Sequence, residues 1–112
     1  MKLLLFIFMR RENRYQASLI KRIKERFPGC IVIKAPSNYI QGIPDLLILY
    51  RDHWAALECK RGLKEVETAR YHEANQDYYV QVMNNMSFAS FISPEIESEV
   101  LDAVQQSFES DR

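Results

Sequence analysis

The chain has 112 residues, of which 47% are hydrophobic and 27% are charged, and its 15 basic residues balance 15 acidic ones. This length suits one small domain with a single modest core and excludes a second core of similar size. The zero net charge excludes no class of partner, but residues 1–64 hold 13 Lys or Arg against 5 Asp or Glu, and residues 65–112 hold 2 against 10. Such asymmetry favours a basic face for a polyanion, unless the two halves mix on one folded surface.

Residues 1–9 form an apolar run that is too short to span a bilayer and lacks the small-residue cleavage site of a signal peptide. Two interpretations remain: an extra edge strand, or an extension from a start codon upstream of Met9. Cys30 and Cys59 lack close spacing, which indicates free thiols in a reducing compartment and no structural zinc. We therefore expect one domain over residues 1–112, with 1–9 as an extra N-terminal segment, a cytoplasmic location and no membrane contact.

The first helix is predicted over residues 11–27. Apolar residues recur there at helical spacing and predict its buried face, namely Tyr15, Leu19, Ile20, Ile23 and Phe27. Glu12 stands in the first turn, where the helix dipole alone favours a carboxylate. A strand is predicted over residues 30–34, and the loop that follows over residues 35–41 is long enough to be functional.

Residues 42–60 predict a β-hairpin, because two short apolar runs flank the polar pair Asp52 and His53. If that pair forms a two-residue loop, Asp45 lies opposite Lys60 on the neighbouring strand. Side chains alternate across a strand, so Asp45, Glu58 and Lys60 then emerge on one face at the open end of the hairpin.

Two carboxylates on one face are ligands for a hard divalent cation such as Mg²⁺. Such an ion polarises a phosphoryl oxygen and lowers the pKa of bound water, while Lys60 can orient or deprotonate that water or stabilise charge on a phosphate. The alternative is an ordinary Asp–Lys pair on a solvated sheet face. Three features favour a metal site. A turn fixes the entry to the strand at Asp45, and the one-residue spacing of Glu58 and Lys60 points both side chains the same way. The two runs are otherwise apolar, which indicates covered strands, where an unpaired charge is costly.

After the hairpin, a basic turn over residues 61–64 suits phosphate contacts, although a solvated turn has the same composition. A second helix containing Gln76 is predicted over residues 66–85, a last strand over 87–92, and a last helix from Ser93 and Pro94 onward. A strand–helix–strand connection makes a right-handed crossover, so the strands before and after the second helix should be parallel. The predicted class is α/β, in the order α-β-β-β-α-β-α, with a mixed sheet flanked by helices.

The stretch Gly42-Ile43-Pro44-Asp45, a hairpin-length spacer and Glu58-Cys59-Lys60 together resemble the PD-(D/E)-x-K nuclease signature. The closer likeness is to its VRR-NUC branch, and within it to short stand-alone phage and prophage proteins. Glu12 and Gln76 occur in the order that the family shows, so the resemblance covers roughly residues 9–93. The bare motif is loose, whereas the ordered set of five side chains is more specific.

This resemblance implies a restriction-endonuclease-like core and an endodeoxyribonuclease that uses Mg²⁺ or Mn²⁺ and no small-molecule cofactor. It implies that Asp45, Glu58 and the backbone carbonyl of Cys59 bind the metal, with Glu12 acting through water. It further implies that Lys60 activates water and that Gln76 orients Lys60. Stand-alone members form homodimers and suit branched DNA such as the four-way Holliday junction. Because these members are encoded by phages and prophages, the resemblance also implies a protein that acts in the cytoplasm of a bacterial cell.

Several side chains near the predicted site are candidates for DNA contact: Arg14, Lys34, Tyr39, Arg61 and Lys64. Ordinary solvated positions would account for them equally well. Two other functions stay open at this point. One is a nucleic-acid-binding module that keeps the fold without cleaving, and the other is an interaction protein that uses the acidic last helix.

Overall fold

The computed structural model describes residues 2–36, 40–68 and 72–110, and of residues 2–12 it describes the backbone alone. Its elements follow one another as α1 (Lys2–Arg26), β1 (Ile31–Lys34), β2 (Leu46–Tyr50), β3 (His53–Cys59), α2 (Leu63–Glu67), α3 (Gln76–Met86), β4 (Phe88–Ile92), the 3₁₀ turn η2 (Pro94–Ile96) and α4 (Glu97–Glu109). The fold is therefore mixed α/β, as the sequence predicts.

The four strands lie in the order β1-β2-β3-β4. Strands β1, β2 and β3 pair antiparallel, whereas β3 and β4 pair parallel, so the sheet is mixed. The parallel pair is the one predicted from the crossover, and α2 and α3 lie within that connection. Among the helices that the structure describes, none is long and apolar enough to cross a membrane.

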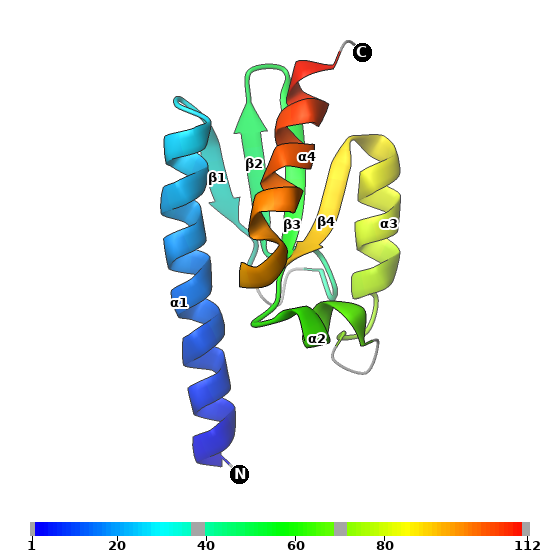
Figure 1. Ribbon diagram of the computed structural model, residues 1–112. Helices are drawn as coiled ribbons and strands as arrows, with labels where there is room; N and C mark the ends of the chain where they lie inside the picture. Colours follow the sequence, from blue (N-terminus) through cyan, green and yellow to red (C-terminus); the bar gives the residue numbers. More distant parts are fainter. Residues whose placement is uncertain (1, 37–39, 69–71, 111–112) are drawn as a thin grey trace.

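The core lies between one face of the sheet and the helices α1 and α4, and α4 crosses that face in Figure 1. Alternate residues of the strands supply the sheet side of this core, because successive side chains point to opposite faces. The fully buried core side chains include Leu19 and Ile23 from α1, Leu46, Ile48 and Leu57 from the sheet, and Val104 from α4. Helix α3 packs against β3 and β4, and its residue Gln76 reaches the opposite face.

Opposite charges join α1 to α4. Arg22 Nε lies 2.5 Å from Glu97 Oε2, and Arg26 pairs with Asp102. The Tyr15 hydroxyl donates a 3.0 Å hydrogen bond to Glu97, and burial together with that carboxylate raises the pKa of the phenol. Part of the charge asymmetry between the two halves of the sequence is therefore neutralised where these helices meet.

Helix α1 begins at Lys2, nine residues before the predicted start at residue 11. The interpretation of residues 1–9 as an edge strand is therefore wrong for the part that the structure describes. Leu and Met are good helix formers, and residues 2–26 contain no Gly or Pro. A helix held in place by the buried residues from Tyr15 onward can therefore continue toward the N-terminus as far as Lys2. In Figure 1 the N-terminal turns of α1 extend past the end of the sheet.

The single helix predicted over residues 66–85 is also wrong, because two helices, α2 and α3, occupy this region. Asn75 adopts φ 71°, a left-handed conformation that a continuous helix excludes. The ring of His72 contributes to the break, since its Nε2 lies 2.9 Å from the carbonyl oxygens of Glu65 and Val66. Those carbonyls thus have a side-chain partner where helix propagation would have supplied backbone N–H groups.

The hairpin prediction is confirmed, but its register is wrong. Tyr50 faces His53, so the two-residue loop is Arg51 and Asp52, and Arg51 takes the positive φ of 58° that a tight hairpin turn needs. His53 belongs to β3 because its ring packs 6.0 Å from that of Phe108 on α4. The partner of each residue therefore shifts by two positions, which leaves every side chain on its predicted face.

Truncation of the core should lower the free energy of unfolding far more than truncation at the surface. Leu19 is 0% exposed and Met86 is 70% exposed. Leu19→Ala is expected to cost about 2–5 kcal/mol, and Met86→Ala about 0.5 kcal/mol or less, in urea titrations followed by circular dichroism. Equal losses in the two variants would contradict the assignment of the core.

Candidate active site

Asp45 lies at the open end of the hairpin, immediately before β2. Pro44, which precedes it, is buried, and the backbone carbonyl of Asp45 accepts a 2.8 Å hydrogen bond from the N–H of Ala35. Its carboxylate accepts a 2.9 Å hydrogen bond from the backbone N–H of Cys59. The observed register, continued by one residue beyond Leu46 and Leu57, places Asp45 opposite Glu58 and not opposite Lys60. The carboxylate is thus held at the end of the β2–β3 pair.

Three buried polar side chains meet on that face: Glu58, Lys60 and Gln76 are 2%, 6% and 6% exposed. The Gln76 Oε1 atom accepts a 2.8 Å hydrogen bond from Lys60 Nζ, and Gln76 Nε2 donates a 3.1 Å hydrogen bond to Glu58 Oε2. Lys60 Nζ lies 4.0 Å from the same carboxylate oxygen. Buried charges are tolerated when they are paired and hydrogen-bonded, and this network meets both conditions.

The side-chain amide of Gln76 has one acceptable orientation. Its Oε1 faces the Lys60 ammonium and also accepts a 3.0 Å hydrogen bond from the backbone N–H of Glu73, whereas its Nε2 faces the Glu58 carboxylate. An exchange of oxygen and nitrogen would set donor against donor and acceptor against acceptor. The predicted contact between Gln76 and Lys60 is therefore present, with Gln76 as the first residue of α3.

Two aromatic rings that the sequence did not indicate lie beside the network. Phe91 on β4 faces Glu58 in the parallel register, and its ring centre is 6.0 Å from Lys60 Nζ. The ring of His72 stacks on Phe91 at 4.3 Å, and its Nδ1 atom lies 2.8 Å from an Asp77 carboxylate oxygen. Only the register between β3 and β4 could have revealed this pairing, because Phe91 stands far along the chain in an ordinary apolar strand.

The donors at this end of the sheet fit a hard divalent cation. Asp45 and Glu58 face each other across the strand pair, and the backbone N–H of Cys59, the residue after Glu58, donates to the Asp45 carboxylate. Mg²⁺ takes one or two protein carboxylates and keeps several waters. Within the described residues, no group of three or more His, Cys, Asp or Glu side chains could hold a metal. The side chain of Glu12 lies outside the described part of α1.

The candidate DNA contacts differ in their surroundings. Arg14, Lys34 and Lys64 are exposed, whereas the Arg61 guanidinium pairs with Glu65 and its backbone N–H donates to the same carboxylate. Tyr39 lies outside the described residues. Of the candidates that the structure describes, Arg14, Lys34 and Lys64 are therefore the basic residues exposed to solvent.

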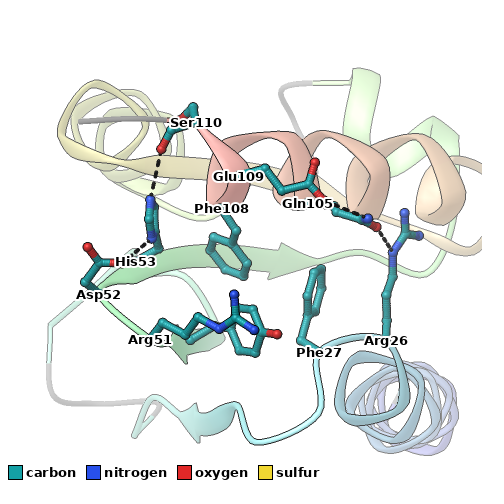
Figure 2. A pocket seen from close by; sticks show the side chains of 10 residues that line it. Arg26, Phe27, Arg51, Asp52, His53, Gln105, Phe108, Glu109 and Ser110 are labelled. Carbon is teal, nitrogen blue, oxygen red and sulfur yellow. Dashed lines mark hydrogen bonds and ion pairs between the residues drawn. The ribbon is translucent and has the colours of Figure 1, made fainter.

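A cavity of about 570 Å³ opens at the other end of the sheet, beside the hairpin loop (Figure 2). Its polar groups are engaged with one another: Arg26 donates to Gln105, His53 contacts Asp52 and the carbonyl of Ser110, and the Arg51 guanidinium lies 4.9 Å from the Tyr50 ring centre. The cavity is thus separate from Asp45 and Lys60, which lie at the opposite end of the hairpin strands.

The two cysteines carry no feature of a reactive or metal-binding pair. Neither of these two residues forms a disulfide; Cys59 is buried in the core, and Cys30 is partly buried. Burial raises the pKa of the Cys30 thiol, which disfavours the nucleophilic thiolate. These thiols therefore belong to the packing of the domain.

No protein-family model, curated protein or solved structure matches this chain. The resemblance to VRR-NUC nucleases therefore rests on the sequence alone, namely on Glu12, the residues from Gly42 to Asp45, those from Glu58 to Lys60, and Gln76. The contacts among Glu58, Lys60 and Gln76 depend on the packing of α3 against the sheet.

Removal of the buried ammonium should destabilise the protein, since the buried Glu58 carboxylate then loses the positive charge that lies 4.0 Å away. Lys60→Met is expected to lower the free energy of unfolding by about 3–5 kcal/mol, whereas Lys64→Met, at an exposed position, should change it by about 0.5 kcal/mol or less. Adding Glu58→Gln to Lys60→Met should recover stability, because the buried charge is then absent. Urea titrations of the three variants measure these differences, and a double variant less stable than Lys60→Met would contradict the pairing.

Proposed function

We propose that the protein is a metal-dependent endodeoxyribonuclease that hydrolyses phosphodiester bonds with Mg²⁺ or Mn²⁺. The observation that carries this proposal is the buried contact of Lys60 with Gln76 and Glu58 at the end of the strand pair that bears Asp45. The order of helices and strands is compatible with the restriction-endonuclease-like core that the motif implies. In a sheet without a functional site, these buried positions would carry apolar side chains.

Asp45, Glu58 and the carbonyl of Cys59 would hold the ion, with Glu12 assisting through water. When bound, the ion supplies a Lewis acid for a phosphoryl oxygen and lowers the pKa of a coordinated water. Lys60 would orient or deprotonate the attacking water, or stabilise the charge that develops on the phosphate. Gln76 would hold the Lys60 ammonium in place through the 2.8 Å hydrogen bond to its Oε1 atom.

The proposed substrate is branched DNA, with the four-way junction as the first choice. The basic side chains Arg14, Lys34 and Lys64, which are exposed, would contact phosphates, with Arg61 and Tyr39 as further candidates. Phosphate contacts position a protein on DNA without reading its sequence, which suits selection by DNA shape. The alternative of an interaction protein is less favoured, because Glu97 and Asp102 on the acidic α4 pair with α1.

The purified protein should cleave DNA only when a divalent cation is present. Linear duplex and four-way-junction DNA are incubated with the protein in Mg²⁺, in Mn²⁺ and in chelator, and the products are resolved on denaturing gels. Cleavage with metal alone supports the nuclease. Binding without cleavage under every condition would favour the non-catalytic nucleic-acid-binding module.

Two substitutions should separate metal binding from catalysis. Asp45→Asn keeps an oxygen that can accept the Cys59 N–H, so the variant should fold but lose both Mn²⁺ binding and cleavage. It should still bind DNA, because a carboxylate that repels phosphate is gone. Lys60→Ala should keep Mn²⁺ binding in calorimetry and lose cleavage on the order of 10²-fold or more, measured where the variant is folded. Full nuclease activity in either variant would refute these roles.

We also propose that the chain forms a homodimer. Ile31 and Ile33 on the edge strand β1 are 59% and 44% exposed, and an exposed apolar edge strand favours association. The N-terminal turns of α1, whose sequence is apolar, extend past the end of the sheet, where a second copy could pack. Light scattering should therefore report twice the chain mass. A monomer mass at high protein concentration, with and without DNA, would rule the dimer out.

A further inference from the structure

Gly42 and the residues just before α3 approach each other so closely that no side chain fits between them. A Cβ added at Gly42 would lie 2.6 Å from the carbonyl carbon of Asn75 and 2.7 Å from the carbonyl oxygen of Ala74. These are backbone atoms, which cannot swing aside as the end of a flexible side chain does. Gly42 also has a φ of +90°, which L side chains rarely adopt. The contact thus requires glycine for two separate reasons.

The chain between Gly42 and Asp45 is stiff. Pro44 locks its own φ and is buried, and the N–H of Ile43 donates a 3.2 Å hydrogen bond to the carbonyl of Ile40. Asp45 is tied to the sheet through Ala35 and through the N–H of Cys59. Residues 40–45, which include Gly42, therefore have little freedom to move away from α3.

The other side of the contact leads directly to the site, because Asn75 is followed by Gln76. The Asn75 carbonyl accepts a 3.0 Å hydrogen bond from the N–H of Tyr79, so Asn75 moves together with the first turn of α3. Gln76 in turn holds both Lys60 and Glu58 through its side-chain amide. A displacement at Asn75 therefore moves the group that orients Lys60.

We propose that Gly42 is a positioning residue, whose backbone contact with Ala74 and Asn75 sets where the Gln76 amide meets Lys60. This inference rests on the proposed nuclease function and deepens it. A side chain at position 42 pushes the start of α3 outward, because the loop is anchored to the sheet. Asp45 and Glu58 stay on their paired strands, so metal binding is retained while Lys60 loses its hydrogen bond to Gln76.

Gly29 supplies a matched control, since it has the same φ of +90° but nothing within 4 Å of an added Cβ. Gly42→Ala and Gly29→Ala share the strain of the left-handed backbone, and only Gly42→Ala meets α3. Both variants should bind Mn²⁺ in calorimetry as the natural chain does. Gly42→Ala alone should lose cleavage, on the order of 10²-fold, which is the loss that a misplacement of about 1 Å can cause. Equal cleavage by the two variants would overturn the inference.

A double-mutant cycle with Gln76→Ala distinguishes positioning from general damage to the fold. If Gly42 acts through Gln76, Gly42→Ala causes no further loss of cleavage once Gln76 is already truncated. Independent structural damage would instead multiply the two losses, and that result would overturn the inference.

The side-chain amide resonance of Gln76 gives a readout that needs no nuclease activity. It should shift in Gly42→Ala and remain in place in Gly29→Ala, and an unshifted signal overturns the positioning role even if the natural chain cleaves DNA. If the natural chain does not cleave, the proposed function fails while this signal still decides the positioning. If Gly42→Ala alone does not fold, Asn75→Gly is added, which removes the 2.8 Å contact with the Asn75 Cβ and gives the backbone at position 75 the freedom to move its carbonyl away from the added methyl group. The double variant should then fold with a displaced Gln76 signal, and an undisplaced signal overturns the inference.

Discussion

The hydrogen bonds of the Gln76 amide to Lys60 and Glu58 are the interaction on which the arrangement of this molecule depends. A buried ammonium and a buried carboxylate each carry a large desolvation cost, and one neutral amide bonds to both. The amide comes from α3, whereas both charges come from the chain at the end of β3. The two charges can therefore be buried only if α3 packs on the sheet with Gln76 facing them. An apolar helix at this place would leave both charges without a hydrogen-bonding partner from the helix.

The need to place Gln76 explains why the connection from β3 to β4 is irregular. A continuous helix over residues 66–85 would satisfy its own backbone, yet the chain breaks at Asn75, in a left-handed conformation. That break lets the Gln76 side chain accept the N–H of Glu73 while it faces the sheet. His72 stabilises the irregular segment by contacting the end of α2 and stacking on Phe91. Local backbone strain of this kind is commonly retained where a polar site depends on it.

The two faces of the sheet have different tasks. One face is covered by α1 and α4, whose opposite charges meet through Arg22 and Glu97 at its border, and it holds the apolar core. The other face carries the polar network beside α3. Strand alternation allows this division, because Leu57 and Cys59 enter the core while Glu58, between them, points away. The core can therefore be stable while the opposite face carries costly buried charge.

The sequence by itself determined the alternation that brings Asp45, Glu58 and Lys60 to one face, because the side-chain period of a strand is two whatever the register. It also determined the buried stripe of α1, which follows from helical periodicity alone. Tertiary structure decided which residues form the hairpin loop. The polarity of His53 had predicted a loop residue, but its ring packs near that of Phe108 and His53 belongs to β3. Tertiary structure also decided the break before Gln76, the approach of Gly42 to Asn75 and the place of Phe91 beside Lys60. Each of these depends on segments distant in the chain that meet only after folding, and no local pattern encodes such a meeting.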